Sequence, residues 1–198
     1  LARYFGDASE LTLPADYKGG SYVIGGSAFS GCKSLTSLTI PNSVANIGNR
    51  AFDSCTGLKK VEINCASVEN WFSGLPSIQE IVLGNDVREI GSYAFHNCTG
   101  LTNIIIPNSV TSIGYCAFIG CSNLRKVMTF SVFIFRKVDS YHGNVAFYAD
   151  EVINMPNGCI DGDFAWCKIN GVNTLARYFG NASELTLPAD YKGESYVI

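Results

Sequence analysis

The sequence predicts a β-rich solenoid with flanking β-hairpin caps, and three observations lead to this prediction. Phenylalanine recurs at a nearly constant spacing, at Phe29, Phe52, Phe72, Phe95 and Phe118. Apolar residues follow each Phe at constant offsets. The segment 1–24 recurs as 175–198 with only two differences, Asp7/Asn181 and Gly20/Glu194, so the chain contains one duplicated unit and the start of the next. A coil this short cannot bury its own apolar edge, so neighbouring coils must stack into one continuous core.

Each coil follows one template when residues are counted from its Phe. The third residue is Cys32, Cys55, Leu75, Cys98 or Cys121, and the sixth is always Leu or Ile. The ninth and eleventh residues are Leu38/Ile40, Val61/Ile63, Ile81/Leu83, Ile104/Ile106 and Val127/Thr129. A fixed period of about 20 to 29 residues with this apolar spacing is typical of leucine-rich repeats. The predicted fold class is therefore a β-rich leucine-rich-repeat solenoid of short parallel strands, turns and short helical or 3-10 segments.

The strands of the template are expected where apolar residues alternate, as at residues 37–40 and 103–106. Alternate residues of a strand point to opposite faces, so the ninth and eleventh residues after each Phe are predicted to face the core. Pro41 and Pro107 follow these two strands and end them. Adjacent strands of such a stack are expected to pair in parallel at about 4.8 Å.

The coils resemble the BspA-type leucine-rich repeat family. Residues 35–55 and 101–121 match its pattern L-x-x-L-x-I-P-x-x-V-x-x-I-G-x-x-A-F-x-x-C almost throughout, and the resemblance covers roughly residues 11–129. It implies a secreted or surface-exposed bacterial protein, with adhesion to host matrix or to other cells as a known role of some members. The third coil departs from the pattern at residues 71–75, after a three-residue deletion, and the fifth loses it after Thr129. The solenoid is expected to bend or stop at these places.

Four segments are predicted along the chain. Residues 1–23 are expected to end a cap hairpin and enter the repeats, residues 24–130 to form a solenoid of about five coils, residues 131–174 to form a β-rich cap or linker, and residues 175–198 to start the next duplicated unit. Two β-prone runs, at residues 163–169 and 172–179, flank Asn170-Gly171, which is a strong hairpin signal. By the duplication, residues 1–10 are expected to be the last strand of such a hairpin without its partner, leaving an unpaired edge near Leu1.

Composition excludes several classes of function. The chain is 47% hydrophobic and 16% charged, with a net charge of −3, so it offers no basic patch for nucleic acid. Its longest largely apolar stretch, residues 127–135, spans nine residues, whereas a membrane helix needs about 20. No nucleic-acid partner and no membrane insertion are expected for this chain.

The eight cysteines are expected to be structural. Leu75 replaces Cys in the third template position, and a position that accepts Leu is an apolar core position. The chain has no C-x-x-C and only two histidines, so zinc-ligand spacing is not met and no metal or other cofactor is predicted. Cys159 and Cys167, in the hairpin region, are the better candidates for a disulfide.

Catalysis is not expected. His96 occupies a position that holds Ser30, Asp53, Ser73 or Ile119 in other coils, and His142 has no nucleophile spaced around it. Two acidic pairs, Asp161/Asp163 and Asp150/Glu151, lack the calcium-loop pattern, and Asp-Gly is common in turns. The glycosylation sequons at Asn97 and Asn181 are poor candidates, because the first contains a core Cys and bacteria rarely use them.

The outward positions of the strands are the candidate partner-binding face. They are the eighth and tenth residues after each Phe, and the tenth column turns apolar at Val82, Ile105 and Met128. The candidate face comprises Glu62, Glu80, Val82, Asn103, Ile105, Lys126 and Met128. A row of exposed apolar side chains suggests a contact site, but the chain's own residues 131–174 could equally cover it.

Two functional hypotheses follow. The first is a non-enzymatic, surface-displayed binding or adhesion module for an unknown protein or glycan partner, such as host matrix or a cell surface. The second is a structural spacer, in which near-identical units are strung together and the face binds nothing. A binder is expected to enrich its exposed face in aromatic residues and Arg, whereas a spacer keeps that face bland.

Overall fold

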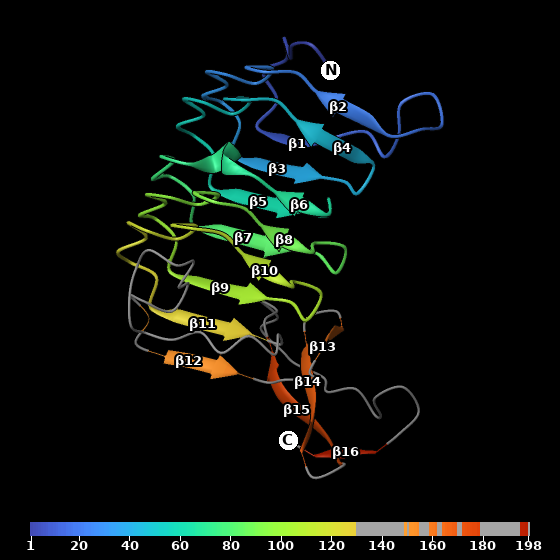
Figure 1. Cartoon of the computed structure of the whole chain (residues 1–198), viewed down its shortest axis with the longest axis vertical. Helices are drawn as coiled ribbons and strands as arrows, with labels where there is room; N and C mark the ends of the chain where they lie inside the picture. The colour runs from blue at the N-terminus through green and yellow to red at the C-terminus, as the bar shows by residue number, and fades with distance from the viewer. Residues whose placement is uncertain are drawn as a thin grey trace.

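The computed structural model describes residues 1–129, 149, 151–154, 159–161, 164–169, 172–178 and 195–197. Short strands stack one above another along the long axis, with the N-terminus at one end (Figure 1). Most strand pairs are parallel, and almost no helix is present in these ranges. The predicted solenoid fold is confirmed.

The first parallel sheet is built from the template strands. One block pairs β1 (Glu10–Thr12), β3 (Ser37–Ile40), β5 (Lys60–Ile63) and β7 (Glu80–Leu83), and a second pairs β9 (Asn103–Ile106), β11 (Lys126–Thr129) and β12 (Glu151–Asn154). The inward residues are removed from solvent as predicted, because Leu38, Ile40 and Val61 are fully buried. Burying each such side chain contributes about 1.5–3 kcal/mol, so the inward columns account for much of the stability of the stack.

A second set of short parallel strands runs along the other side of each coil. β2 (Tyr22–Ile24) pairs with β4 (Val44–Ile47), and β6 (Ser67–Val68), β8 (Glu89–Ile90) and β10 (Ser112–Ile113) form a separate three-stranded sheet. One 3-10 turn, η1 (Asn70–Phe72), carries the departure from the template that the sequence showed at Trp71 and Phe72. Both of its aromatic side chains are buried.

An aromatic stack runs the length of the described coils at the turn that follows the second strand. The rings of Phe29, Phe52, Phe72, Phe95 and Phe118 lie 5.2, 5.2, 6.2 and 5.3 Å from one to the next. Tyr4 extends it with a centroid distance of 5.1 Å to Phe29. We call these six rings the Phe stack. Offset stacking at this separation adds about 0.5–1.5 kcal/mol per pair beyond area burial.

The Cys position of the template lies beside the Phe stack and is buried in every coil but the first, where Cys32 is half-buried. The thiols of Cys55, Cys98 and Cys121 donate to the backbone carbonyls of the Phe residues of the preceding coils, at 3.1, 3.3 and 3.1 Å. Burial raises the pKa of the Cys55 thiol to about 11 and that of Cys121 to about 12. The structural role predicted for these residues is confirmed, and the thiol donor explains why Cys rather than another small apolar residue recurs there.

Glycine is required where successive coils touch at the Ile-Gly turn. A Cβ at Gly48 would lie 2.4 Å from the backbone N of Gly26, and one at Gly114 would lie 2.4 Å from the N of Ser92. Real Cβ atoms do not approach backbone this closely, so each coil closes against the previous one only because these two residues have no side chain.

The pairing of strands is interrupted around the third coil. β7 and β9 belong to separate sheets, and so do β4 and β6, although all these residues are described. The widest separation in the Phe stack, between Phe72 and Phe95, falls at the β7/β9 junction. Above the shortened third coil, the side chain of Asn42 donates to Asp86 two coils away at 3.0 Å. The expected irregularity near the third coil therefore takes the form of two breaks in the ladders.

The two ends of the repeats show how the ladder continues. The N-terminal amine of Leu1 and the backbone N–H of Tyr4 donate to the carbonyls of Val23 and Ala28, so this segment lies along the first coil, and its assignment to the end of a cap hairpin stays a prediction. The parallel ladder also continues past the fifth coil, since β12 pairs with β11 over all four residues. The ladder therefore reaches into the segment that the sequence assigned to a cap.

The predicted hairpin is present. β14 (Phe164–Ile169) and β15 (Val172–Tyr178) pair antiparallel on either side of Asn170-Gly171. β13 (Cys159–Asp161) adds to β14, and β16 (Tyr196–Val197) pairs in parallel with β15. The predicted disulfide between Cys159 and Cys167 involves side chains outside the described part of the structure and stays a prediction.

Candidate binding surface

The outward side of the first parallel sheet, which we call the sheet face, brings the predicted binding residues into aligned columns. Lys60 lies opposite Glu80, and Glu62 lies opposite Val82, because β5 and β7 pair in register. In the second block, Asn103 lies opposite Lys126 and Ile105 opposite Met128. The seven candidate residues therefore occupy two neighbouring blocks, as their spacing in the sequence predicts.

Exposure differs among the three apolar residues of the tenth column. Val82 is 37% exposed and Ile105 is half-buried, so both contribute apolar area to the sheet face. Met128 is only 2% exposed, so it adds no accessible area to the sheet face, and its role as a contact residue stays a prediction. Met128 lies on the outward side of β11, opposite Ile105, and is buried there outside the core cluster. The accessible apolar area is limited to Val82 and Ile105.

Charged and polar side chains surround this apolar pair. Lys60 Nζ lies 2.9 Å from Glu80 Oε1, and both side chains are about half exposed. Asn64 Nδ2 donates to Glu62 Oε1 at 3.1 Å. An exposed ion pair of this kind contributes about 0–1 kcal/mol, so these groups affect recognition more than stability.

A second exposed group of side chains lies at the turn that carries the Phe stack, and it was not predicted from the sequence. The ring of Tyr93 lies 5.7 Å from His96 and 5.7 Å from Tyr115, edge to face in both cases. Ser73 Oγ lies 3.2 Å from His96 Nδ1. Tyr93 and Tyr115 are 41% and 46% exposed. The pKa of the Tyr93 hydroxyl is raised, mainly by partial desolvation and to a lesser extent by the nearby Cys116 thiol.

We call Tyr93, His96 and Tyr115 the aromatic cluster. His96 is half-buried, and its ring is hydrogen-bonded to Ser73, the residue in the same template position of the preceding coil. The sequence signal for the cluster is Tyr between Ile-Gly and Ala-Phe, which occurs only in these two coils, but the contact between the two rings becomes visible only in the structure.

Among the described residues, no group of three or more His, Cys, Asp and Glu side chains could hold a metal ion. In the same part of the chain, no helix is long and apolar enough to cross a membrane. Asn97 of the first sequon is exposed, while its middle residue Cys98 is buried. His142, Asn181 and the side chains of the two acidic pairs lie outside the described residues.

Comparison with known proteins agrees with the coil geometry. The model of the BspA type leucine-rich repeat region, in six copies, matches residues 8–125 and 68–149. The chain belongs to the BspA-type leucine-rich repeat family. No curated protein matches it.

Solved structures of bacterial leucine-rich repeat proteins are similar to this BspA-type chain. A leucine-rich repeat protein of T. pallidum is 30% identical, with a TM-score of 0.59 over 78% of this chain and 73% of its own. A leucine-rich repeat protein from Bacteroides ovatus is 32% identical, with a TM-score of 0.48 over 61% of this chain and 37% of its own. A leucine rich cell surface protein from Faecalibacterium prausnitzii is 24% identical, with a TM-score of 0.38 over 89% of this chain and 56% of its own.

Proposed function

We propose that this BspA-type chain is a non-enzymatic binding module, displayed outside the cell, that holds a protein partner on its sheet face. The observation that carries the proposal is that exposed Val82 and half-buried Ile105 occupy the same template position in adjacent coils, on the face that also carries Lys60, Glu80 and Asn103. An apolar centre with a polar rim is the usual anatomy of a protein interface. Family membership supports a role in protein contacts rather than catalysis.

A protein partner fits this surface better than a small glycan. Small ligands bind in concave sites that bury most of their surface, whereas the sheet face presents strands side by side. The aromatic cluster supplies two exposed Tyr residues on the same coils, and Tyr is enriched among residues that dominate binding energy. We therefore infer that a protein contacting the third and fourth coils can use both surfaces.

The spacer hypothesis is the alternative, and the duplication favours it. Residues 1–24 and 175–198 agree even at Lys18, which is exposed in the first copy and corresponds to Lys192. Recent duplication of whole units produces this agreement, and strings of units are suited to project another domain. The sheet face distinguishes the two hypotheses, since a spacer tolerates any soluble substitution there.

The test compares two doubly substituted chains of equal charge. Val82→Lys with Ile105→Lys changes the sheet face, and Ala45→Lys with Ser112→Lys changes exposed positions on the second set of strands. Binding to immobilised extracellular-matrix proteins and to a glycan array is measured for both variants and for the unchanged chain.

We expect the first variant to lose about tenfold or more in affinity for a matrix protein, equivalent to at least about 1.4 kcal/mol, and the second to bind like the unchanged chain. Equal loss in both variants would assign the binding to general charge rather than to the sheet face. Absence of binding to every matrix protein by the unchanged chain would leave the spacer as the better account, and binding to glycans alone would overturn the protein partner.

A further inference from the structure

The duplicated segments show the same sequence at two places in the structure. In the first copy, the N-terminal amine of Leu1 donates to the Val23 carbonyl at 2.6 Å, and the Gly25 N–H donates to the Leu1 carbonyl at 2.7 Å. This pattern places Leu1 opposite Ile24 in a parallel pair.

In the second copy the same register continues further along the chain. Asn173 lies opposite Tyr196 and Thr174 opposite Val197, again in parallel and with the offset that separates Leu1 from Ile24. Leu175 and Ile198 correspond to Leu1 and Ile24 in the duplication. The first copy therefore continues, at Leu1, the register that the second copy shows at Asn173 and Thr174, where the partner strand β15 is half of the β14–β15 hairpin.

The open edge of β2 in the first copy is chemically suited to that pairing. The Tyr22 N–H donates to Ser43, and the Ile24 carbonyl accepts from Gly48, so both groups face the β4 side. Backbone groups alternate along a strand, and the Val23 N–H consequently points to the other edge. The Val23 side chain is 56% exposed.

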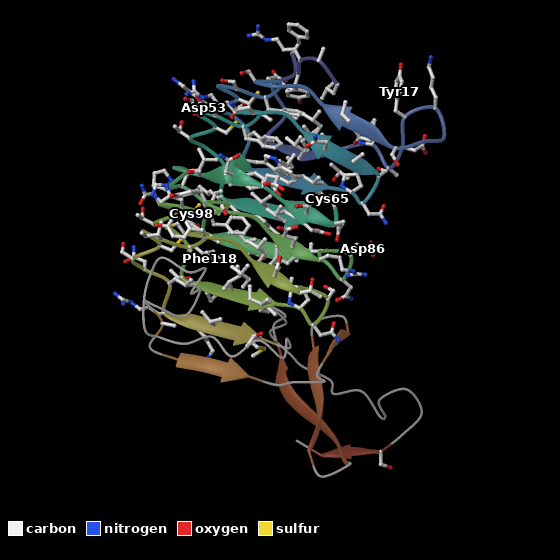
Figure 2. The ribbon with its side chains drawn as sticks, in the orientation of Figure 1. Tyr17, Asp53, Cys65, Asp86, Cys98 and Phe118 are labelled. Atoms are coloured by element: carbon white, nitrogen blue, oxygen red, sulfur yellow. The ribbon has the colours of Figure 1, made fainter. Side chains whose placement is uncertain are left out.

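A hollow of about 710 Å³ lies beside this edge. Its lining includes Leu1, Ala2, Pro14, Tyr17, Tyr22 and Val23. Tyr17 is 64% exposed on a projecting loop (Figure 2), which a tight turn with positive φ at Lys18 and Gly19 holds away from the coil. Exposed aromatic and aliphatic side chains around an open strand edge form a surface that a further strand can cover.

We propose that this hollow and the β2 edge form a docking socket for a β-hairpin with the sequence of β14–β15, supplied by a neighbouring copy of the duplicated unit. Strand addition at an open edge gives affinity through backbone hydrogen bonds and specificity through side-chain pockets. The hairpin sequence includes apolar Phe164, Trp166 and Ile169, in keeping with an apolar hollow. Docking would join two solenoids through one continuous sheet. This proposal does not depend on which partner the sheet face binds.

This chain's own hairpin is not the occupant, because β15 already pairs with β16. An unrelated peptide is also not favoured, since the register at Leu1 repeats that of β15 and the two copies of the surrounding segment differ at only two positions. The occupant that these observations specify is a second hairpin of the same sequence.

The test adds residues 159–174 directly before Leu1 of the full chain. Hydrogen exchange is measured at Val23, with Leu38 and Ile40 as a check that the solenoid is folded. We expect hydrogen exchange of the Val23 amide to slow by about tenfold. This is the effect of one new backbone hydrogen bond whose net contribution to stability lies near the top of the usual range. The matched control carries Phe164→Ser and Trp166→Ser in the added copy only, and its Val23 amide should slow no more than with residues 172–174 alone.

A three-residue extension with residues 172–174 provides a second variant with little capacity to disturb folding. It supplies the pairing strand without the hairpin, and we expect a smaller but measurable slowing at Val23. Equal slowing with the serine control, or no slowing with either extension while Leu38 stays protected, would overturn the proposal. Slowing in the unextended chain on raising its concentration would show that a separate molecule supplies the hairpin.

Discussion

The turn that carries the Phe stack and the sheet face lie on the same coils but vary in opposite ways. At the turn, Phe is invariant in five coils and the third position is Cys in four of them. On the sheet face, the tenth position is Thr39, Glu62, Val82, Ile105 and Met128 in the same five coils. The turn therefore determines how coils stack, and the face is free to acquire other properties without changing the fold.

The Phe stack gives the largest expected effect. Phe95→Ala should destabilise the chain by about 3–5 kcal/mol, because it removes a fully buried ring that contacts Phe72 and Phe118 on both sides. Phe95→Leu, which keeps much of the volume, should cost less. Chemical denaturation followed by circular dichroism measures the free energy of unfolding of both variants. If Phe95→Ala lowers it no more than a surface substitution does, the turn does not control stacking.

The glycine contact at the same turn should come next. Gly48→Ala places a methyl group against the backbone of Gly25 and Gly26, neither of which can move without breaking a coil contact, so we expect a loss of about 1–3 kcal/mol. Gly20→Ala is the matched control, since its nearest atom is 3.9 Å away and the duplicated segment has Glu194 there. Equal melting temperatures for the two variants would contradict this account.

The Cys position should be more tolerant. Cys98→Leu loses the weak thiol hydrogen bond to Phe72 but keeps an apolar side chain, as Leu75 does in the third coil, and we expect a cost below about 1.5 kcal/mol. Thermal melts of Cys98→Leu and Phe95→Ala provide the comparison. If Cys98→Leu destabilises the chain as much as Phe95→Ala, the assignment of these two residues to their template positions is wrong.

The buried thiols predict a loss of stability in alkaline solution. Burial raises the pKa of Cys55 from 9.0 to about 11, so the stabilisation is complete below pH 9 and is lost as the pH rises towards 11. By pH 10 each such thiol should account for about 1 kcal/mol, because only the unfolded chain releases its proton. Urea unfolding between pH 8 and 10.5 measures how steeply the free energy of unfolding falls with pH, and this slope should be shallower in Cys98→Leu. An identical slope in that variant would exclude the thiols as its cause.

The sheet face should give the smallest effect. Replacing Lys60 or Glu80 with Gln should cost less than about 1 kcal/mol, and the cost should fall as salt screens the pair. A double-mutant cycle at low and high salt measures the coupling. A coupling energy well above this range, or one that salt does not reduce, would mean that the face contributes to stability as the turn does.

The sequence predicted the repeating parts of the fold well, because the same constraint acts on every coil. The offsets from Phe identified Leu38, Ile40 and Cys98 as interior residues, and all three are buried. Alternation likewise predicted which residues of β5 and β7 share the sheet face. Repetition averages out local ambiguity, which explains this success.

The departures from the template were harder to predict. Tyr4 joins the Phe stack from a position well before Phe29, and nothing in the spacing separates it from Phe5, which is exposed. Burial of Met128 and continuation of the ladder into β12 depend on the segment after the fifth coil, where the template ends. The aromatic cluster depends on two side chains from different coils meeting, and a single coil does not reveal that.

The break between β7 and β9 has a mechanical consequence. A stack joined by backbone ladders and ring contacts resists extension along its axis only as well as its weakest junction. At this junction the first sheet has no ladder pairing, and the Phe72 and Phe95 rings are 6.2 Å apart, against 5.1 to 5.3 Å elsewhere in the stack. Under tension, the first sheet should open here first, and the short β8–β10 ladder should be the strand pairing that still joins the two stacks.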